Sequence, residues 1–437
     1  MSFGQALRFW LKLGFLGFGG PAGQIALMHE ELVERRRWIS EGRFLHALNY
    51  CMVLPGPEAQ QLATYLGWLM HRTWGGIAAG ALFVLPSLFI LIALTWVYLA
   101  WGSVPAIAGL FYGLKPAVTA LVLQAAHRIG GRVLRNGWLW ALAAAAFAAL
   151  FLLDAPFPLI VLAAAAAGHL GGRWAPQAFA PAGHAAAARR SRSPALIDDD
   201  TPPPPHAHFS RRRLARVIGT GLLLWAAGMA ALVLAFGADG VLAQMGGFFT
   251  KAALLTFGGA YAVLPYVYQG AVEQFHWLTG AQMMDGLALG ETTPGPLIMV
   301  VAFVGFVGGW TRELFGPEAP FLAGATAAAV VTFFTFLPSF VFILAGGPLI
   351  EHTHGRLGFT APLTAITAAV VGVILNLALF FAGHVLWPQG WGGRLDVPAA
   401  LLTLAASLAL LRWRVGVMPV LAGCGLAGLA LRSLGLA

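Results

Sequence analysis

Phe18-Gly19-Gly20-Pro21 and, further along, Leu54-Pro55-Gly56-Pro57 each stand in the middle of an apolar segment. Glycine loosens a helix interior and proline removes one of its hydrogen bonds. We therefore expect a helix break at both motifs, within segments that are otherwise apolar.

Both motifs return in the second part of the chain. Phe257-Gly258-Gly259 and Pro294-Gly295-Pro296 follow their counterparts at one offset of 239 residues. The same offset pairs three further positions: Lys12 with Lys251, Glu34 with Glu273, and Trp38 with Trp277. Repetition in one register predicts a duplicated domain.

The register changes once within the repeat. Leu85-Pro86-Ser87 matches Leu337-Pro338-Ser339 at an offset of 252 residues. The second copy therefore carries about 13 extra residues, which we place in the loop around Thr311 to Ala319.

Composition sets the class of protein. Of the 437 residues 59% are hydrophobic and 10% are charged, and the mean hydropathy is +0.77. Apolar stretches of 18 residues or more, such as Gly75 to Ala100, recur along the chain and are long enough to cross a bilayer. We expect an all-α polytopic membrane protein that has lipid as its solvent.

The net charge of +9 comes largely from short basic clusters between apolar segments, which is typical of membrane topology signals rather than of nucleic-acid binding. Cys51 and Cys424 lie in apolar stretches without metal-ligand spacing, so we expect no disulfide and no metal site. Enzyme motifs such as His-Glu-x-x-His are absent from the sequence. An intramembrane enzyme is thus a remote alternative, and no cofactor is expected.

The chain divides into four parts. We expect a first repeat over 1–172, a disordered cytoplasmic linker over 173–213, a connecting transmembrane helix over 214–236 and a second repeat over 241–437. The linker is rich in Ala, Pro, His, Arg and Asp, which is typical of a solvated segment.

An odd connecting helix would invert the second copy, and the charges agree. The loop Glu30 to Arg43 carries four arginines, whereas its counterpart Gln269 to Gln282 carries no Lys or Arg. Inverted repeats are a recurrent design of secondary transporters. If every segment spans, the chain has about thirteen spans and the Arg35 to Arg37 loop lies opposite the linker. If the two motifs break hairpins, there are about nine spans and four broken elements, and the two basic segments share one side; we prefer this arrangement.

The breaks are the candidate binding site. A helix that restarts inside the membrane points free N–H groups and its positive dipole end into a cavity, which attracts anions. The anion-binding candidates are therefore the four motifs and one nearby amide: Phe18, Gly19, Gly20 and Pro21; Pro55, Gly56, Pro57 and Gln60; Phe257, Gly258 and Gly259; and Pro294, Gly295 and Pro296. Four packing kinks in ordinary helices are the alternative.

Charged residues near the breaks have two readings each. Lys12 and Lys251 either attract the anion or snorkel to an interface. Arg35, Arg36 and Arg37 either collect anions or anchor the topology. Glu58 and Glu291 are candidates for proton coupling, with helix capping as the alternative.

The ordered set of motifs resembles the signature of the chromate ion transporter family in its long, two-domain form. The set comprises Phe18-Gly19-Gly20-Pro21, a charged loop that ends in Arg36-Arg37-Trp38, and Leu54-Pro55-Gly56-Pro57 with Gln60 and Gly67; Thr256-Phe257-Gly258-Gly259 and Thr293-Pro294-Gly295-Pro296 follow in the second half. The resemblance implies efflux of chromate across the bacterial inner membrane and hence chromate resistance. Sulfate or another anion is the alternative substrate on the same scaffold, and monomer and homodimer both stay open.

Overall fold

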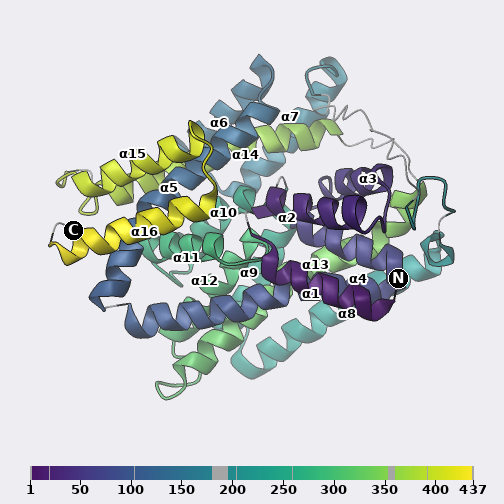
Figure 1. Cartoon of the computed structure of the whole chain (residues 1–437), viewed down its shortest axis with the longest axis horizontal. Coiled ribbons are helices and arrows are strands. Elements are labelled where there is room, and N and C mark those ends of the chain that lie inside the picture. The colour runs from purple at the N-terminus through teal and green to yellow at the C-terminus, as the bar shows by residue number, and fades with distance from the viewer. Residues whose placement is uncertain are drawn as a thin grey trace.

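The computed structural model describes residues 2–18, 20–102, 104–179, 195–202, 204–257, 259–352, 360–390 and 392–435. Within these ranges the chain forms sixteen α-helices and no β-strand, and the all-α prediction is confirmed. Figure 1 shows how the helices are arranged. Gly19, Gly258 and part of the linker (180–194 and residue 203) lie outside the described residues.

The first repeat begins with short helices and continues with long ones. Its elements are α1 (Phe3–Leu16), α2 (Gly20–His29), the π-helical turn η1 (Glu30–Arg35), α3 (Glu41–Cys51), α4 (Glu58–Trp101), α5 (Pro105–Val133), α6 (Gly137–Leu153) and α7 (Phe157–Trp174).

A 3₁₀ turn, η2 (Pro205–Ala207), and the connecting helix α8 (Arg211–Phe236) lead into the second repeat. Gly221 is the one buried residue of α8, so this helix lies on the outside of the bundle. The second repeat comprises α9 (Val241–Leu255), α10 (Ala260–Tyr268), η3 (Gln269–Gln274), α11 (Gly280–Thr292), η4 (Leu297–Met299), α12 (Val300–Thr311), α13 (Pro320–His352), α14 (Thr360–Leu386), α15 (Val397–Leu411) and α16 (Val417–Ser433).

Helices end at all four motifs, as expected. The backbone has positive φ at Gly20 and Gly259 (68° and 97°) and at Gly56 and Gly295 (129° and 112°). Residues with a side chain rarely adopt this conformation, so glycine lets the chain turn at these points. The broken-helix prediction is confirmed.

Local structure repeats at the offset found in the sequence. The π-helical turns Glu30–Arg35 and Gln269–Gln274 are 239 residues apart, and so are Arg37 and His276, which share φ near 50°. The extra residues of the second copy fall where we expected them. Thr311 ends α12 and Pro320 starts α13, whereas α4 runs on with only a kink at His71 and Arg72.

Helix lengths favour hairpins at the breaks. Five helices are long and apolar enough to cross a membrane: α4, α5, α8, α13 and α14. The helices that flank the breaks are shorter, from 9 residues in α10 to 15 in α9, and α4 has only a short piece before its kink. A span needs about 20 residues, so none of these helices crosses the membrane alone, which agrees with hairpins at the breaks.

Contacts between the linker and the first repeat also choose between the two topologies. The amides of Leu196 and Ile197 donate to the carbonyls of Arg37 and Trp38, at 2.9 and 3.1 Å. Groups in direct hydrogen bonds lie on the same side of a membrane. The arginine loop and the linker therefore share one side, which favours the hairpin arrangement over the thirteen-span alternative.

The same contacts correct our view of the linker. We expected disorder throughout 173–213, but residues 195–202 form a short strap across the start of α3. Ile197 pairs with Ile39 in a parallel bridge, and the Ser40 hydroxyl donates to Asp199 Oδ1 at 2.6 Å. Polar composition suggested solvation, whereas these polar groups find partners in the first repeat.

Helix α12 forms the centre of the second repeat. All its residues from Val300 to Gly309 are buried, although they are apolar on every side. A helix that is hydrophobic all round is surrounded by protein or lipid. Here α13, α4 and α11 surround it, and the breaks lie at its start.

Candidate functional site

The breaks of the two repeats are joined by reciprocal hydrogen bonds. The amide of Gly56 donates to the carbonyl of Thr256 at 2.7 Å, and the amide of Gly295 donates to that of Gly17 at 3.0 Å. Gly56 and Gly295 are equivalent positions, and so are Gly17 and Thr256. Two equal contacts with the repeats exchanged indicate a local pseudo-two-fold axis through the site.

A pair of equivalent serines completes this symmetry. A Cβ atom added to Gly56 would collide with the hydroxyl of Ser339, and one added to Gly295 would lie 2.6 Å from Cβ of Ser87. These serines belong to the Leu-Pro-Ser motifs of α4 and α13. Each Pro-Gly-Pro turn is therefore pressed against a long helix of the other repeat, and only glycine fits.

Neighbouring helices connect the two pairs of breaks. Helix α2 packs on α4, α10 packs on η4, and α4 packs on η4. The starts of all four restarting helices are thus gathered in the middle of the bundle. The first-turn N–H groups of a helix have no partner within it, so this arrangement can place four partly positive ends around an anion.

Buried amides surround the breaks in the first repeat. Gln24 Nε2 donates to the carbonyls of Gly17, at 3.0 Å, and of Gly295. Gln61 Nε2 donates to Pro55 O at 2.8 Å, and Gln60 Nε2 to Thr64 at 3.0 Å. Gln24, Gln60 and Gln61 have no exposed surface, so the centre is closed to solvent in this structure.

The same amides keep unused hydrogen-bonding capacity. The Oε1 atoms of Gln24, Gln60 and Gln61 and the hydroxyl of Ser339 are buried without a hydrogen-bond partner among the described residues. A buried polar atom without a partner costs about 1–3 kcal/mol. Such a cluster is typical of a site that opens to water or ligand in another conformation.

The two candidate carboxylates have different surroundings. Glu58 begins α4 directly after Pro57 and makes no hydrogen bond or ion pair in the described part of the chain. Glu291 lies in the last turn of α11, is buried, and accepts a hydrogen bond from the hydroxyl of Tyr261. A negative charge is favourable at a helix start and unfavourable at a helix end. The helix dipole therefore stabilises a charged Glu58 and disfavours a charged Glu291, and both residues stay candidates for proton coupling.

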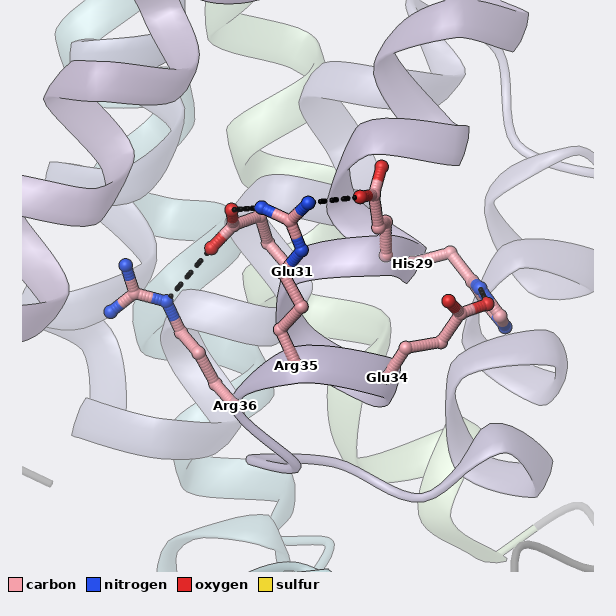
Figure 2. A network of polar contacts seen from close by, with 6 residues as sticks. His29, Glu31, Glu34, Arg35 and Arg36 are labelled. Carbon is pink, nitrogen blue, oxygen red and sulfur yellow. Dashed lines mark hydrogen bonds and ion pairs between the residues drawn. The ribbon is translucent and has the colours of Figure 1, made fainter.

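The candidate cations lie at exposed positions. Lys12 and Lys251 are both exposed, on α1 and α9, and anion attraction and snorkelling stay the two alternatives for them. Arg35 forms an ion pair with Glu30 at 2.7 Å, and both Arg35 and Arg36 lie 3.1 Å from Glu31, as Figure 2 shows. Their charge is thus largely balanced.

Aromatic rings hold Arg36 further in place. Its guanidinium lies over the rings of Phe9 and Trp38, with 5.2 and 4.9 Å to their centroids. These contacts of Arg35 and Arg36 agree with a topological anchor, and anion collection stays the alternative for the three arginines.

Several site residues were not predicted from the sequence. Gln24 and Tyr261 act through contacts with residues far along the chain or on another helix, which no local pattern reveals. Ser87 and Ser339 were visible as parts of a repeated motif, but their contact with the glycines depends on the packing of the two repeats. Asp285 is a further buried carboxylate, on α11.

Comparison of the sequence with known protein families connects these features to one family. The chromate transporter family model matches residues 4–169 and 243–429, which are the two repeats without the linker and α8. The chain belongs to the chromate transporter family. The recognition made from the motifs is confirmed, and the two matched regions place one pair of breaks in each repeat.

Relatives of the family match over nearly the whole chain. A chromate transport protein of Pseudomonas aeruginosa is 34% identical over 98% of this chain and 92% of its own length. A chromate transport protein of Cupriavidus metallidurans is 29% identical over 97% of this chain and 92% of its own length.

A shorter relative matches only part of the chain. The uncharacterized transporter YwrB of Bacillus subtilis is 30% identical over 29% of this chain and 66% of its own length. No solved structure matches the chain.

Proposed function

We propose that the protein is a secondary transporter that moves chromate out of the cell through the four helix breaks. The observation that carries the proposal is the pair of reciprocal hydrogen bonds, Gly56 to Thr256 and Gly295 to Gly17, which gathers the breaks of both repeats at one point. Membership of the chromate transporter family names the class of substrate.

The geometry supports transport by alternating access. Each Pro-Gly-Pro turn rests on the other repeat, so a relative movement of the repeats changes both contacts at once. Movement in one direction would open the centre to one side, and the opposite movement would open it to the other. The N–H groups of the helix starts would then meet the anion, and the unpaired amide oxygens would accept hydrogen bonds from water.

The membrane potential favours efflux. Moving one charge through 100 mV changes the free energy by about 2.3 kcal/mol, so a dianion that leaves a negative interior gains roughly 4 to 5 kcal/mol. This corresponds to about three orders of magnitude in concentration. The potential alone could therefore drive a uniporter, and exchange for protons or sulfate is the alternative. The proposed location is the bacterial inner membrane.

Chromate accumulation in a sensitive bacterium tests the proposal. Cells that express the wild-type protein should accumulate less chromate than empty cells. A Gly56→Leu variant present at an equal level in the membrane should lose this effect, because its side chain would collide with Ser339 and Gln61.

Sulfate, the tetrahedral isostere of chromate, serves as the competitor in the same assay. If expression leaves chromate accumulation unchanged, chromate efflux is rejected. Uptake of labelled sulfate that depends on expression would then assign the scaffold to sulfate.

A further inference from the structure

One ion pair between the repeats lies apart from the breaks. Asp285 of α11 approaches Lys115 of α5, with 3.6 Å between Oδ2 and Nζ. The hydroxyl of Tyr98, on α4, donates to the same oxygen at 2.9 Å. Thus a carboxylate of the second repeat meets a cation and a hydroxyl of the first.

The carboxylate of this ion pair is enclosed, whereas the cation is accessible. The side chain of Asp285 is 5% exposed and that of Lys115 is 29% exposed. Every other residue of α5 from Gly113 to Val122 is buried, so Lys115 is the accessible point of this stretch of α5. An anion that reaches this point meets the ammonium group.

The pair lies between the breaks and one rim of the molecule. Asp285 is midway along α11, which runs from its capping residue Thr279 to the break at Pro294. Tyr98 is close to Trp101, the last residue of α4. In the hairpin arrangement this rim is the one opposite the arginine loop, which makes it the outer rim.

The equivalent positions of the two repeats do not form a second such ion pair. His46 occupies the position equivalent to Asp285, and Thr367 occupies the one equivalent to Lys115. The pair is therefore not required by the shared architecture of the repeats. It adds charge on one side of the breaks only.

A buried ion pair is costly to assemble and seldom adds stability. Asp285 has a further oxygen, Oδ1, that is buried without a hydrogen-bond partner among the described residues. Ionisable residues inside membrane segments commonly belong to an ion pathway. These observations favour a role in transport over a role in folding.

We propose that Lys115 is a second anion-binding residue on the exit route and that Asp285 is its resident counter-ion. This inference rests on the proposed efflux of an oxyanion. An anion that leaves the breaks displaces the carboxylate from the ammonium group, so the lysine always keeps one negative partner. The lysine thereby draws the anion outward, and the returning carboxylate expels it.

A proton accompanies the exchange. While the anion occupies Lys115, the Asp285 carboxylate accepts one proton from the outer solution, which spares a second buried negative charge. The Lys115 ammonium keeps its protons throughout. When the anion departs, Asp285 returns its proton to the same side and pairs with the lysine again.

The groups that face Asp285 are Lys115 and Tyr98, and no other charged group among the described residues acts on it. Of the other elements packed on α11, η4 and α12 contain no titratable residue, and Arg432 of α16 lies against Gly109. The external pH should therefore act on the exchange through Asp285.

Chromate flux in proteoliposomes tests the inference through four variants: Lys115→Met, Asp285→Asn, the double variant and Asp396→Asn. Asp396 is the matched control, because it accepts a hydrogen bond from Tyr112 of the same helix α5 at 2.6 Å but has no lysine partner. Flux is measured against substrate concentration and against the pH on the outer side.

We expect Lys115→Met and the double variant to lose at least tenfold in maximal flux. Asp285→Asn should lower both KM and maximal flux, because nothing displaces the bound anion, and it should abolish the dependence on outer pH. Asp396→Asn should keep the wild-type pH profile.

Recovery of flux in the double variant would overturn the inference, because it would show that the pair is structural. Unchanged flux in Lys115→Met would overturn it as well. Both results leave the proposed function standing as long as the wild type transports chromate. If the wild type moves neither chromate nor sulfate, the proposed function fails and this inference fails with it.

Discussion

At the scale of single residues, Gln24 is a side chain that joins the helix breaks of the two repeats. Its amide donates to a carbonyl in each repeat, those of Gly17 and Gly295. Both carbonyl acceptors belong to helix breaks, where backbone groups lack a hydrogen-bond partner within a helix. The loss of this one amide therefore affects both halves of the site.

Gln24→Leu should lower the free energy of unfolding by about 1–3 kcal/mol, because two hydrogen bonds are lost at a buried position. A shift of the melting temperature by a few degrees in detergent measures this, together with a loss of chromate flux. Gln244→Leu is the control, since Gln244 donates to Asp239 at an exposed site. Equal melting temperatures for both variants would contradict the role assigned to Gln24.

Glu31 makes the stability of the arginine loop depend on pH. Its hydrogen bond from Arg36, together with the charges of Arg36, Lys12 and Arg35, holds the pKa of Glu31 below the ordinary value of 4.5. A lowered pKa means that the carboxylate stabilises the fold above pH 4.5, and that this contribution disappears as the pH falls further.

Carboxylates usually titrate between about pH 5 and pH 3. Over this range the melting temperature of the wild type should fall more steeply than that of Glu31→Gln. Glu34→Gln is a suitable control, because Glu34 is 63% exposed and contacts only a histidine among the described residues. Parallel curves for the wild type and Glu31→Gln would reject the assignment.

At the scale of elements, the breaks could be predicted and the strap could not. Gly-Gly and Pro-Gly-Pro act on their own backbone, so their effect on a helix follows from local chemistry. The partners of the strap are about 160 residues away in sequence, as Ser40 and Asp199 show. Composition described the linker as solvated and contained no information about those partners.

The strap offers a direct test of the element arrangement. Ile39 and Ile197 are paired in a parallel bridge, so cysteines at both positions should form a disulfide on mild oxidation in native membranes. Cys51 and Cys424 are first replaced by alanine to remove the native thiols. Ile39→Cys paired with Asp239→Cys is the control, because Asp239 precedes α9 at the opposite rim.

A crosslink for Ile39 with Ile197, and none for the control, supports the hairpin arrangement. Failure of Ile39 and Ile197 to crosslink under conditions that oxidise exposed thiols would separate the arginine loop from the linker and would restore the thirteen-span arrangement.

At the scale of the whole molecule, the duplication could be predicted from the sequence because both copies keep the same glycine and proline positions. The four breaks therefore pointed to the site before its geometry was known. The functional asymmetry between the repeats was harder to predict from the sequence than the duplication. Gln24, Gln60 and Gln61 have apolar counterparts in the second repeat, Val263, Met299 and Val300. Only packing reveals that one set of amides serves breaks from both halves.

This asymmetry assigns different tasks to the two halves of the site. The first repeat supplies the buried amides around the centre, and the second supplies the buried carboxylates Asp285 and Glu291. These buried amides and these two carboxylates thus come from opposite repeats. A movement between the repeats then changes the distance between them.

A transport site built from the paired helix breaks can be tested by chromate flux into proteoliposomes. Four purified proteins are compared: the wild type, Gly56→Ala, Gly295→Ala and Gly131→Ala. A methyl group at Gly56 or Gly295 opposes a positive φ and collides with a serine of the other repeat, whereas at Gly131 nothing lies within 4 Å. We expect Gly56→Ala and Gly295→Ala each to lose most of the flux, about tenfold or more for a cost above about 1.4 kcal/mol, while Gly131→Ala should match the wild type. Wild-type flux in both Gly56→Ala and Gly295→Ala would contradict a transport site built from the paired helix breaks.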